Sequence, residues 1–429
     1  MDISVIGAGY VGLTTSACLA KIGHRVICVD NDSAKIETLI RGKLPIYEPG
    51  LKEIIAETVS CGKLTFTTDI KRAIENSIVC FIAVGTPPLE TGEPDLTNVE
   101  AVARQIAGWM SGYRLIVEKS TVPVQTAKWI RTTVERYNRN QVDFDVACNP
   151  EFLREGSAVY DFLHPDRIVI GVENERARNL MEDIYRPLNA PLIITDLASA
   201  ELIKHASNAF LAMKISFINA ISFICEAVGA DIAEVAKGIG MDHRIGCQFL
   251  NAGIGYGGFC FPKDLKAFIR IAHELGYDFR LLREVEKINE DAKTRFVRKI
   301  KNTLWNLKDK TIGILGLSFK PNTDDMRFAP SVDIINALLS EGALIRAYDP
   351  QAMENARKIL PKVEFCPEPE MVADNADLIA ILTEWDSFLK LDWEKIKKRM
   401  RIPIIADGRN MLERKFMENL GFIYIGVGR

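Results

Sequence analysis

The sequence lacks the features that mark secreted, membrane-spanning and nucleic-acid-binding proteins. No apolar run reaches the ~20 residues of a membrane span. The most apolar stretch, residues 210–228, carries Lys214, Asn219 and Glu226, which favours a buried helix. The formal net charge of -3 provides no broad basic field for nucleic acid or anionic lipid. The first residues show no basic region followed by an apolar signal core, so we expect no secretion.

Cysteine spacing excludes further kinds of site. The nine cysteines form no CxxC pair and none of the short regular spacings of a disulfide or zinc framework. We therefore expect reduced and mostly buried thiols, a cytoplasmic location and no bound metal.

Apolar strand-like segments alternate with helix-length segments in the first third of the chain. They are residues 2–6, 25–29, 78–84, 114–118 and 144–148. Such alternation predicts a parallel, doubly wound sheet. From residue 198 to about residue 289, apolar residues recur every three or four positions, as in helices. Strand-like segments return at 311–317, 344–348, 378–382 and 403–406.

The last third of the chain repeats the plan of the first third: a strand, glycines, a helix, and a second strand that ends on an acid. One hydrophobic core rarely grows beyond about 250 to 300 residues, so a chain of this length should contain several domains. We predict an α/β fold with two Rossmann-like, doubly wound parallel-sheet domains joined by a central helical domain with a long helix. The predicted domains are residues 1–197, 198–295 and 296–429.

Glycines at positions 7, 9 and 12 follow the first predicted strand and open a helix. In a dinucleotide-binding turn, Gly7 allows the tight turn, Gly9 lets the backbone approach the pyrophosphate, and Gly12 lets the helix pack closely on the strand. Asp30 ends the next strand, where it can bind the adenosine ribose and repel the 2′-phosphate of NADP, which favours NAD. Lys35 weakens that preference slightly. A glycine-rich turn without a ligand is the alternative, which this context disfavours.

Two further turns follow predicted strands, at the edge where open parallel sheets bind ligands. Residues 85–88 (Gly-Thr-Pro-Pro) follow one strand, and residues 120–123 (Ser-Thr-Val-Pro) follow another. By spacing alone, a plain proline turn explains each of them equally well.

Cys260 is the strongest candidate for a nucleophile. It follows glycines at 253, 255, 257 and 258, which should let the backbone approach a ligand and leave the thiol uncrowded. Lys263 and Asp264 follow within one helical turn, and a nearby cation favours the thiolate. A buried structural cysteine is the alternative for each of the nine, but only Cys260 has these neighbours.

Four polar residues are candidates to support this thiol. Glu151 and Glu155 follow the strand at 144–148, where a carboxylate can activate water or orient a lysine, or can simply be solvated. Lys204 and Asn208 share one face of an apolar helix, and a surface stripe is the alternative there.

Seven segments, in order, resemble the UDP-glucose/GDP-mannose dehydrogenase family, and the resemblance covers nearly the whole chain. They are Gly-Ala-Gly-Tyr-Val-Gly-Leu (7–13), Val-Gly-Thr-Pro (84–87), Ser-Thr-Val-Pro (120–123), Asn-Pro-Glu-Phe-Leu-Arg-Glu-Gly (149–156), Glu-Leu-Ile-Lys-His-Ala-Ser-Asn-Ala-Phe (201–210), Gly-Tyr-Gly-Gly-Phe-Cys-Phe-Pro-Lys-Asp (255–264) and Gly-Leu-Ser-Phe-Lys-Pro-Asn-Thr-Asp-Asp-Met-Arg (316–327). The resemblance implies an N-terminal domain that binds NAD, a central domain that forms a dimer interface, and a C-terminal domain that binds a UDP-sugar.

The resemblance further implies a four-electron oxidation of UDP-glucose to UDP-glucuronate with NAD. The primary alcohol first becomes an aldehyde, which Cys260 captures as a thiohemiacetal; a second hydride transfer gives a thioester, and water releases the acid. Oxidation of UDP-N-acetylmannosamine or GDP-mannose is the nearest alternative. The run from Cys260 to Asp264 favours UDP-glucose, because the amino-sugar enzymes resemble this run less well. A two-electron hydroxyacid dehydrogenase and a non-catalytic nucleotide-sugar-binding protein are more distant alternatives.

Residue roles also follow from the resemblance. Cys260 is the nucleophile, and Lys204 stabilises the developing oxyanion with help from Asn208. Glu151 and Asp264 are the candidates for water activation, and Thr121 orients the water. The residues implied to bind NAD are Gly7, Gly9, Tyr10, Val11, Gly12, Asp30, Lys35, Thr86, Thr121, Glu155, Lys263 and Arg327. The residues implied to bind the nucleotide sugar are Glu151, Phe152, Leu153, Arg154, Glu155, Lys204, Asn208, Arg244, Phe249, Leu250, Asn251, Ala252, Gly253, Gly257 and Lys320. In the family Arg244 reaches the neighbouring subunit's site, so we expect a homodimer or a higher homo-oligomer.

At three positions this sequence differs from the residue that is most common in the family. Phe259 stands where serine is usual, Gln125 where glycine is usual, and Phe328 where glutamate is common. None of them removes a proposed catalytic group. Phe259 should change the polarity beside the thiol. Phe328 should change the contacts to NAD or the contacts between domains.

Overall fold

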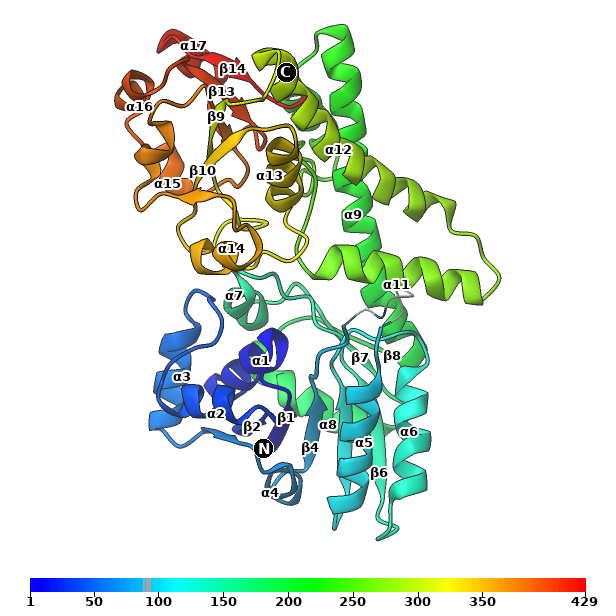
Figure 1. The fold of residues 1–429 in the computed structure, drawn as a ribbon. Coiled ribbons are helices and arrows are strands. Elements are labelled where there is room, and N and C mark those ends of the chain that lie inside the picture. The colour runs from blue at the N-terminus through cyan, green and yellow to red at the C-terminus, as the bar shows by residue number, and fades with distance from the viewer. Residues whose placement is uncertain (88, 90–93) are drawn as a thin grey trace. The chain divides into compact units, whose positions relative to one another are not determined.

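The computed structural model describes residues 1–87, 89 and 94–429, so Pro88 of the predicted turn at 85–88 lies outside the described residues. The chain forms two compact units. Unit 1 holds Met1–Ser207 and Lys266–Gly276, and unit 2 holds Asn208–Leu265 and Tyr277–Arg429. Figure 1 labels the helices and strands of both units. The division into three domains stays a prediction.

Unit 1 is built on an eight-stranded sheet with the strand order β3-β2-β1-β4-β5-β6-β7-β8. The strands are β1 (Asp2–Ile6), β2 (Arg25–Val29), β3 (Leu64–Thr67), β4 (Val79–Ile82), β5 (Arg114–Glu118), β6 (Phe144–Cys148), β7 (Ile168–Gly171) and β8 (Leu192–Thr195). Alternate side chains of a strand point to opposite faces. In β4, Val79 and Phe81 join one apolar core, while Cys80 and Ile82 join the other. Both faces of the sheet are therefore covered, as a parallel sheet requires.

Helices of unit 1 cover both faces of this sheet. They are α1 (Tyr10–Lys21), α2 (Ser33–Ile40), α3 (Leu51–Ser60), α4 (Ile70–Glu75), α5 (Thr97–Trp109), α6 (Thr126–Tyr137), α7 (Ala158–Leu163) and α8 (Glu175–Tyr185), with a 3-10 turn at Arg186–Leu188. Helices α1, α2, α3, α7 and α8 contribute to one core, and α4, α5 and α6 contribute to the other. Figure 1 shows α5 and α6 side by side on their face. The predicted doubly wound arrangement is confirmed.

Three strands of unit 1 were not predicted. β3 and β8 are partly exposed edge strands, so their apolar signal is weak. β7 is fully buried but only four residues long, and it pairs antiparallel with β6. The sheet is therefore mixed at this one pairing, and parallel elsewhere.

Unit 2 contains a six-stranded parallel sheet with the order β11-β10-β9-β12-β13-β14. The strands are β9 (Thr311–Leu315), β10 (Leu344–Tyr348), β11 (Glu364–Phe365), β12 (Leu378–Ile381), β13 (Ile404–Asp407) and β14 (Ile423–Ile425). The four predicted strands correspond to β9, β10, β12 and β13, and the two short edge strands were missed.

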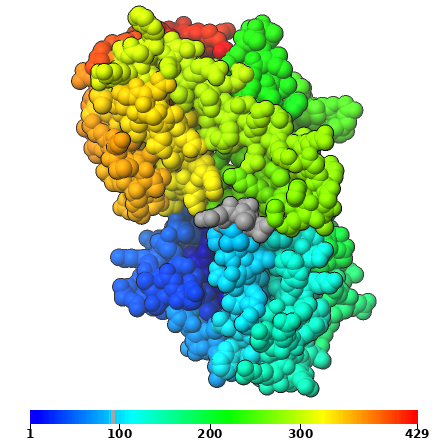
Figure 2. Space-filling model, turned by 45° about the vertical axis from the view of Figure 1, so that its right-hand side comes forward, coloured from blue at the N-terminus to red at the C-terminus, as the bar shows by residue number. Residues whose placement is uncertain are grey.

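The helices of unit 2 are α10 (Ile232–Gly240), α12 (Arg280–Leu304), α13 (Pro330–Ser340), α14 (Met353–Ile359), α15 (Asp386–Leu389), α16 (Trp393–Arg399) and α17 (Arg414–Asn419), with a 3-10 turn at Pro369–Ala373. Helix α12 buries Val285, Phe296 and Ile300, whereas many of its charged residues are exposed. Figure 2 shows this yellow-green part of the chain on the surface.

Two helices, α9 (Leu197–Val228) and α11 (Cys260–Glu274), contribute residues to both units. The expectation of a buried helix at 210–228 is wrong. Phe210, Phe217 and Ile224 recur every seven residues on one side of α9 and are 58%, 51% and 58% exposed. Within the part of the chain that the structure describes, α9 is the one helix long and apolar enough to cross a membrane, and 33% of its most apolar window is buried. Length and composition alone are weak evidence for a membrane span.

Candidate active site

The first turn of unit 1 has the geometry that a dinucleotide pyrophosphate needs. Gly7 has a φ of +110°, and a Cβ there would lie 2.5 Å from the Ala83 carbonyl oxygen. A Cβ on Gly12 would lie 1.8 Å from the Gly7 carbonyl oxygen, because α1 packs directly on the turn. A Cβ on Gly9 would meet nothing within 4 Å, and Gly9 caps α1 without a side-chain hydrogen bond. The turn therefore leaves open space at the start of a helix, where anions bind, and it fits NAD.

Asp30 is anchored to the same turn. Its carboxylate accepts hydrogen bonds from Ala8 N at 2.8 Å, from Asp32 N at 3.0 Å and from Lys35 Nζ at 2.8 Å. Burial favours the neutral acid, but these bonds outweigh burial and hold the pKa of Asp30 below its ordinary value. Because Lys35 is paired with Asp30, its charge is directed at the carboxylate, and the site keeps the carboxylate that favours NAD.

The corresponding turn of unit 2 is built differently. Ser318 stands where Gly9 stands in unit 1 and is only 1% exposed. Asp349 corresponds to Asp30, and its Oδ2 accepts from Leu317 N at 2.7 Å and Trp385 Nε1 at 3.1 Å. Protein donors also occupy its other oxygen, which accepts from two backbone amides at 2.8 Å. This turn therefore lacks the open glycine of the unit 1 turn, and its aspartate is hydrogen-bonded by protein donors on both oxygens.

Thr86 and Thr121, both predicted to contact NAD, lie together after β4 and β5. Thr86 Oγ1 donates to the Thr121 carbonyl oxygen at 2.9 Å. Ser120 Oγ donates to the Val84 carbonyl oxygen at 2.8 Å. The two turns are thus fastened to each other at the carboxyl edge of the sheet.

Glu48, which the sequence did not identify, fastens the glycine turn to the loop after β6. Its buried carboxylate accepts from the Tyr10 hydroxyl, from Gly156 N at 2.7 Å and from Ala158 N at 2.7 Å. Burial and the contact with Glu48 raise the pKa of Tyr10, so its hydroxyl remains a donor. Glu155, a predicted NAD contact, precedes Gly156 in this loop. Glu48 follows no predicted strand and belongs to no motif, so no sequence pattern predicted its role at the site.

Glu151 and Lys204 form a buried ion pair. Their charged atoms are 2.9 Å apart, and their side chains are 4% and 5% exposed. Leu153 N donates to the other oxygen of Glu151 at 2.5 Å, and the Lys204 ammonium lies 5.5 Å from the centre of the Phe152 ring. A solvated loop and a surface stripe are therefore the wrong interpretations for these two residues. A cation and a carboxylate in contact can stabilise an oxyanion and accept a proton.

Cys260 begins α11 and is half-buried. One turn later, the buried Asp264 accepts a hydrogen bond from Asn208 Nδ2 at 2.6 Å and pairs with Lys263 Nζ at 2.7 Å. Three predicted site residues of unit 2 therefore meet in the first turn of the helix that carries the thiol. A helix N-terminus favours the thiolate form of a cysteine.

The glycines before Cys260 have a packing role that the sequence did not predict. A Cβ on any of the four would come within 3 Å of a protein atom: the Gly408 carbonyl oxygen at Gly253 (2.8 Å), Asn289 Oδ1 at Gly255 (2.7 Å), the Phe328 carbonyl oxygen at Gly257 (2.3 Å) and the Phe319 ring at Gly258 (2.7 Å). Protein atoms therefore fill the space in which a Cβ would lie, and the expectation that this backbone approaches a ligand stays a prediction. The four glycines let this loop pack tightly against other parts of unit 2.

The three unusual residues each show a local consequence. The Phe259 ring centre lies 5.6 Å from Lys263 Nζ and 4.4 Å from the Arg327 guanidinium carbon, so the ring makes cation–π contacts with two predicted NAD contacts. Gln125 has a φ of +82° and Phe328 a φ of +51°. Since this region favours glycine, the usual glycine at position 125 is explained by the backbone.

The other predicted nucleotide-sugar contacts are spread over both units. In unit 1, Arg154 is exposed and pairs with Asp161 at 2.6 Å. In unit 2, Arg244 is 78% exposed and pairs with Asp242 at 2.6 Å. Within residues 249–253 of unit 2, Leu250 and Ala252 are buried, Asn251 is exposed, and Phe249 has a φ of +64°. Lys320 Nζ lies 5.4 Å from the Phe319 ring centre.

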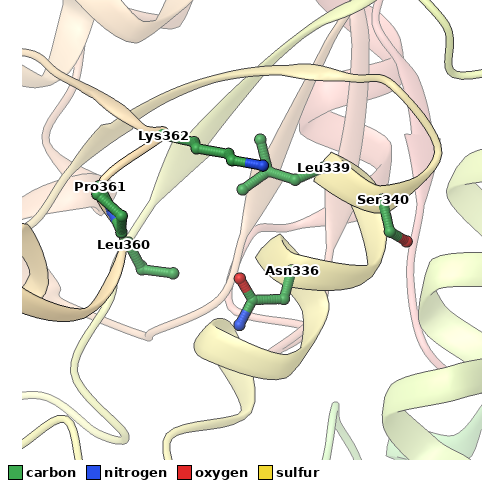
Figure 3. Close-up of a pocket in the computed structure, with 6 residues that line it drawn as sticks. All are labelled: Asn336, Leu339, Ser340, Leu360, Pro361 and Lys362. Carbon is green, nitrogen blue, oxygen red and sulfur yellow. The ribbon is translucent and has the colours of Figure 1, made fainter.

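Cysteines, clusters of metal-binding side chains and surface hollows are the places where a further site could lie. None of the nine cysteines, all of which lie in the described part of the chain, forms a disulfide, and six of them are buried, as predicted. In residues 1–87, 89 and 94–429, no group of three His, Cys, Asp or Glu side chains could hold a metal ion. A surface hollow of about 270 Å³ lies in unit 2 (Figure 3). Its lining contains no predicted site residue and consists of Asn336, Leu339, Ser340, Leu360, Pro361 and Lys362.

Comparisons with known proteins agree with the geometry. Three sequence profiles of the UDP-glucose/GDP-mannose dehydrogenase family match in order: the NAD binding domain over residues 1–189, the central domain over 198–291 and the UDP binding domain over 313–414. The UDP-glucose 6-dehydrogenase TuaD of Bacillus subtilis (strain 168) is 47% identical, covering 100% of this chain and 93% of its own length. The UDP-glucose 6-dehydrogenase of Rhizobium meliloti (strain 1021) is 46% identical over 100% of both chains.

A solved structure shares the whole fold. The UDP-glucose dehydrogenase of Pyrobaculum islandicum matches with a TM-score of 0.93 at 39% identity, covering 99% of this chain and 97% of that one. The predicted pair of Rossmann-like domains around a long helix is therefore confirmed. The chain belongs to the UDP-glucose/GDP-mannose dehydrogenase family of NAD-dependent oxidoreductases.

Proposed function

We propose that this protein is a UDP-glucose 6-dehydrogenase, which oxidises UDP-glucose to UDP-glucuronate with NAD. The observation that carries the proposal is the position of Cys260 one helical turn before Asp264, which Asn208 and Lys263 hold in place. The choice of UDP-glucose is supported by relatives of that name at 47% and 46% identity over this whole chain. The UDP-D-ManNAc dehydrogenase of Pyrococcus horikoshii is 31% identical.

The residues of this chain divide the chemistry between them. NAD, when bound, accepts a hydride in each of the two oxidations. Lys204 stabilises negative charge on the oxygen of the sugar's sixth carbon, and Asn208 assists it. The Cys260 thiolate adds to the aldehyde carbon, and the resulting C–S bond persists through the second oxidation as a thioester.

Hydrolysis then frees the thiol. Glu151 or Asp264 takes a proton from a water that Thr121 orients, and the water oxygen bonds to the acyl carbon. The C–S bond breaks, Cys260 leaves as a thiolate, and the sugar acid departs. Glu151 is supported in this role by its burial and its contact with Lys204.

The stoichiometry of the reaction tests this route. We expect two NADH for each UDP-glucuronate formed, counted by absorbance against chromatography of the product. A ratio of one would overturn the thioester mechanism. A panel of UDP-glucose, UDP-N-acetylmannosamine and GDP-mannose, assayed for NADH formation, tests the sugar separately.

We propose a homodimer in which α9 packs against its copy. The apolar, exposed side chains of Phe210, Phe217 and Ile224 support this proposal. The exposed Arg244 would then enter the partner's site. Neither Arg244→Ala nor Cys260→Ser should form UDP-glucuronate alone. Mixing the two variants should restore UDP-glucuronate formation, because each mixed dimer contains one site with both residues intact. Failure to restore activity while the mixed dimer forms would overturn the shared site.

We also propose a cytoplasmic location, which the nine free cysteines support because disulfides are rare there. Cell fractionation followed by an antibody against the protein tests it.

A further inference from the structure

Lys119 is a second buried lysine beside the catalytic ion pair. It directly follows β5 and is 4% exposed. Its ammonium donates to both oxygens of Asn149, to Oδ1 at 3.0 Å and to the carbonyl oxygen at 3.3 Å. Asn149 is itself fixed, because it donates to the Val169 carbonyl oxygen at 2.8 Å and accepts from the Tyr185 hydroxyl. Lys119 therefore holds, by hydrogen bonds to Asn149, the start of the loop that contains Glu151.

The charges around Lys119 leave Glu151 as its main counterion. The ionisable groups that face it are Glu118 from β5, Cys148 from β6, Glu151 from the loop after β6 and Lys204 from α9. Burial raises the pKa of Glu118 well above its ordinary value, and the nearby Glu201, whose pKa burial also raises, adds to this effect. Cys148 donates to Glu118 at 3.2 Å, and burial raises its pKa as well. Burial therefore disfavours the charged forms of Glu118 and Cys148, and Glu151 is the carboxylate that contacts Lys204 and also attracts Lys119.

We propose that Lys119 is a positioning residue for Glu151: it fixes the Glu151 loop through Asn149 and, together with Lys204, places positive charge beside the Glu151 carboxylate. This inference rests on the proposed function, in which Glu151 is a candidate for water activation. Two buried cations around one carboxylate stabilise its charged form, whereas one cation does so less. Lys119 touches neither substrate nor thiol in this scheme and acts through Glu151.

The experiment compares Lys119→Met, which removes the charge, with Lys119→Arg, which keeps it. We expect the acid limb of the kcat profile to move to higher pH by about one unit in Lys119→Met, because the variant removes a buried positive charge beside the catalytic groups. Lys119→Arg should return the limb toward its wild-type position. Lys128→Met is the matched control, since it removes an exposed lysine of the same unit and should leave the profile unchanged.

Two outcomes would overturn the proposal. A uniform loss of kcat without movement of the acid limb would show a purely structural role for Lys119. If Lys119→Met does not fold, Lys119→Gln replaces it, because the amide still donates to Asn149. Failure of both neutral variants to fold, while Lys119→Arg folds, would make the charge a requirement of the fold and sink the proposal.

A second measurement needs no substrate and separates this inference from the proposed function. Burial lowers the pKa of Lys119 from 10.5 to about 8. Between these values the unfolded chain keeps a proton that the folded chain has released, so wild-type stability should rise with pH relative to Lys119→Met. If thermal unfolding shows this rise but UDP-glucose is not oxidised, the buried charge stands and the proposed function fails. A parallel pH course for the two proteins would show that Lys119 is not buried as an ammonium.

Discussion

Gly9→Ala should separate NAD binding from folding. The backbone at Gly9 has a φ of -75° and a ψ of -171°, an extended conformation that alanine adopts freely. A Cβ there meets nothing within 4 Å, so the folded protein has room for it. The free energy of unfolding should therefore change by less than about 1 kcal/mol. The methyl group instead occupies the space through which the backbone would approach the pyrophosphate.

The expected loss of NAD affinity follows from the hydrogen bonds that the pyrophosphate would lose. A bond to a charged group contributes about 1.5 to 3 kcal/mol, and about 1.4 kcal/mol corresponds to a tenfold change in Kd. Displacing the pyrophosphate from one such amide should therefore weaken NAD binding about 10- to 100-fold. Calorimetric titration with NAD measures the affinity, and thermal unfolding of the same samples measures the stability.

Gly12→Ala is the matched control. Its Cβ would lie 1.8 Å from the Gly7 carbonyl oxygen, so the helix or the turn must move and the protein should lose stability. Wild-type NAD affinity in Gly9→Ala would refute the assignment of this turn. A large loss of stability in Gly9→Ala would refute the inference that the space beside it is open.

Three further predictions test the buried charges and the nucleophile. Glu118→Gln should gain stability over the wild type above pH 4.5, by up to about 1.4 kcal/mol per pH unit, because the folded wild type keeps a proton that the unfolded chain loses. If the difference in melting temperature between the variant and the wild type is the same at pH 5 and at pH 8, this prediction is contradicted. Lys204→Met should cost about 3 to 5 kcal/mol because it removes the cation that contacts the buried Glu151 carboxylate. Adding Glu151→Gln should recover part of this loss in denaturant unfolding, and no recovery would mean that the broken ion pair is not the cause. Cys260→Ser should permit the first oxidation and block release of the acid, so undiminished turnover would show that another group is the nucleophile.

Local patterns predicted the parts of the fold whose causes are local. The turn role of Gly7 and the packing role of Gly12 are confirmed, since both depend on a strand, a turn and a helix within a short segment. The central strands were also predicted, because burial on both faces makes them continuously apolar. The edge strands β3, β8 and β14 were missed because their residues are partly exposed and short of apolar contacts.

Residues that work through distant contacts could not be predicted in the same way. Glu48 bonds to Gly156 N and Ala158 N, more than a hundred positions away, and nothing in its own neighbourhood indicates this. The role of Lys119 depends on burial among groups from three other segments. Family resemblance placed Glu151 and Lys204 in one site, but their ion pair became visible only in the fold.

The position of the nucleophile is likewise set by residues far along the chain. Its glycine-rich loop packs on backbone from the last strands and turns of unit 2, and Ile254 N donates to the Gly408 carbonyl oxygen at 3.0 Å. Arg409 adds a second tie by donating to the Gly255 carbonyl oxygen at 2.9 Å. A side chain at these positions would meet backbone at Gly253 and Gly257, the Asn289 side chain at Gly255 and the Phe319 ring at Gly258. Contacts with α12, with the loop after β9 and with the turn after β13 therefore hold the segment before Cys260, and with it the start of α11, within unit 2.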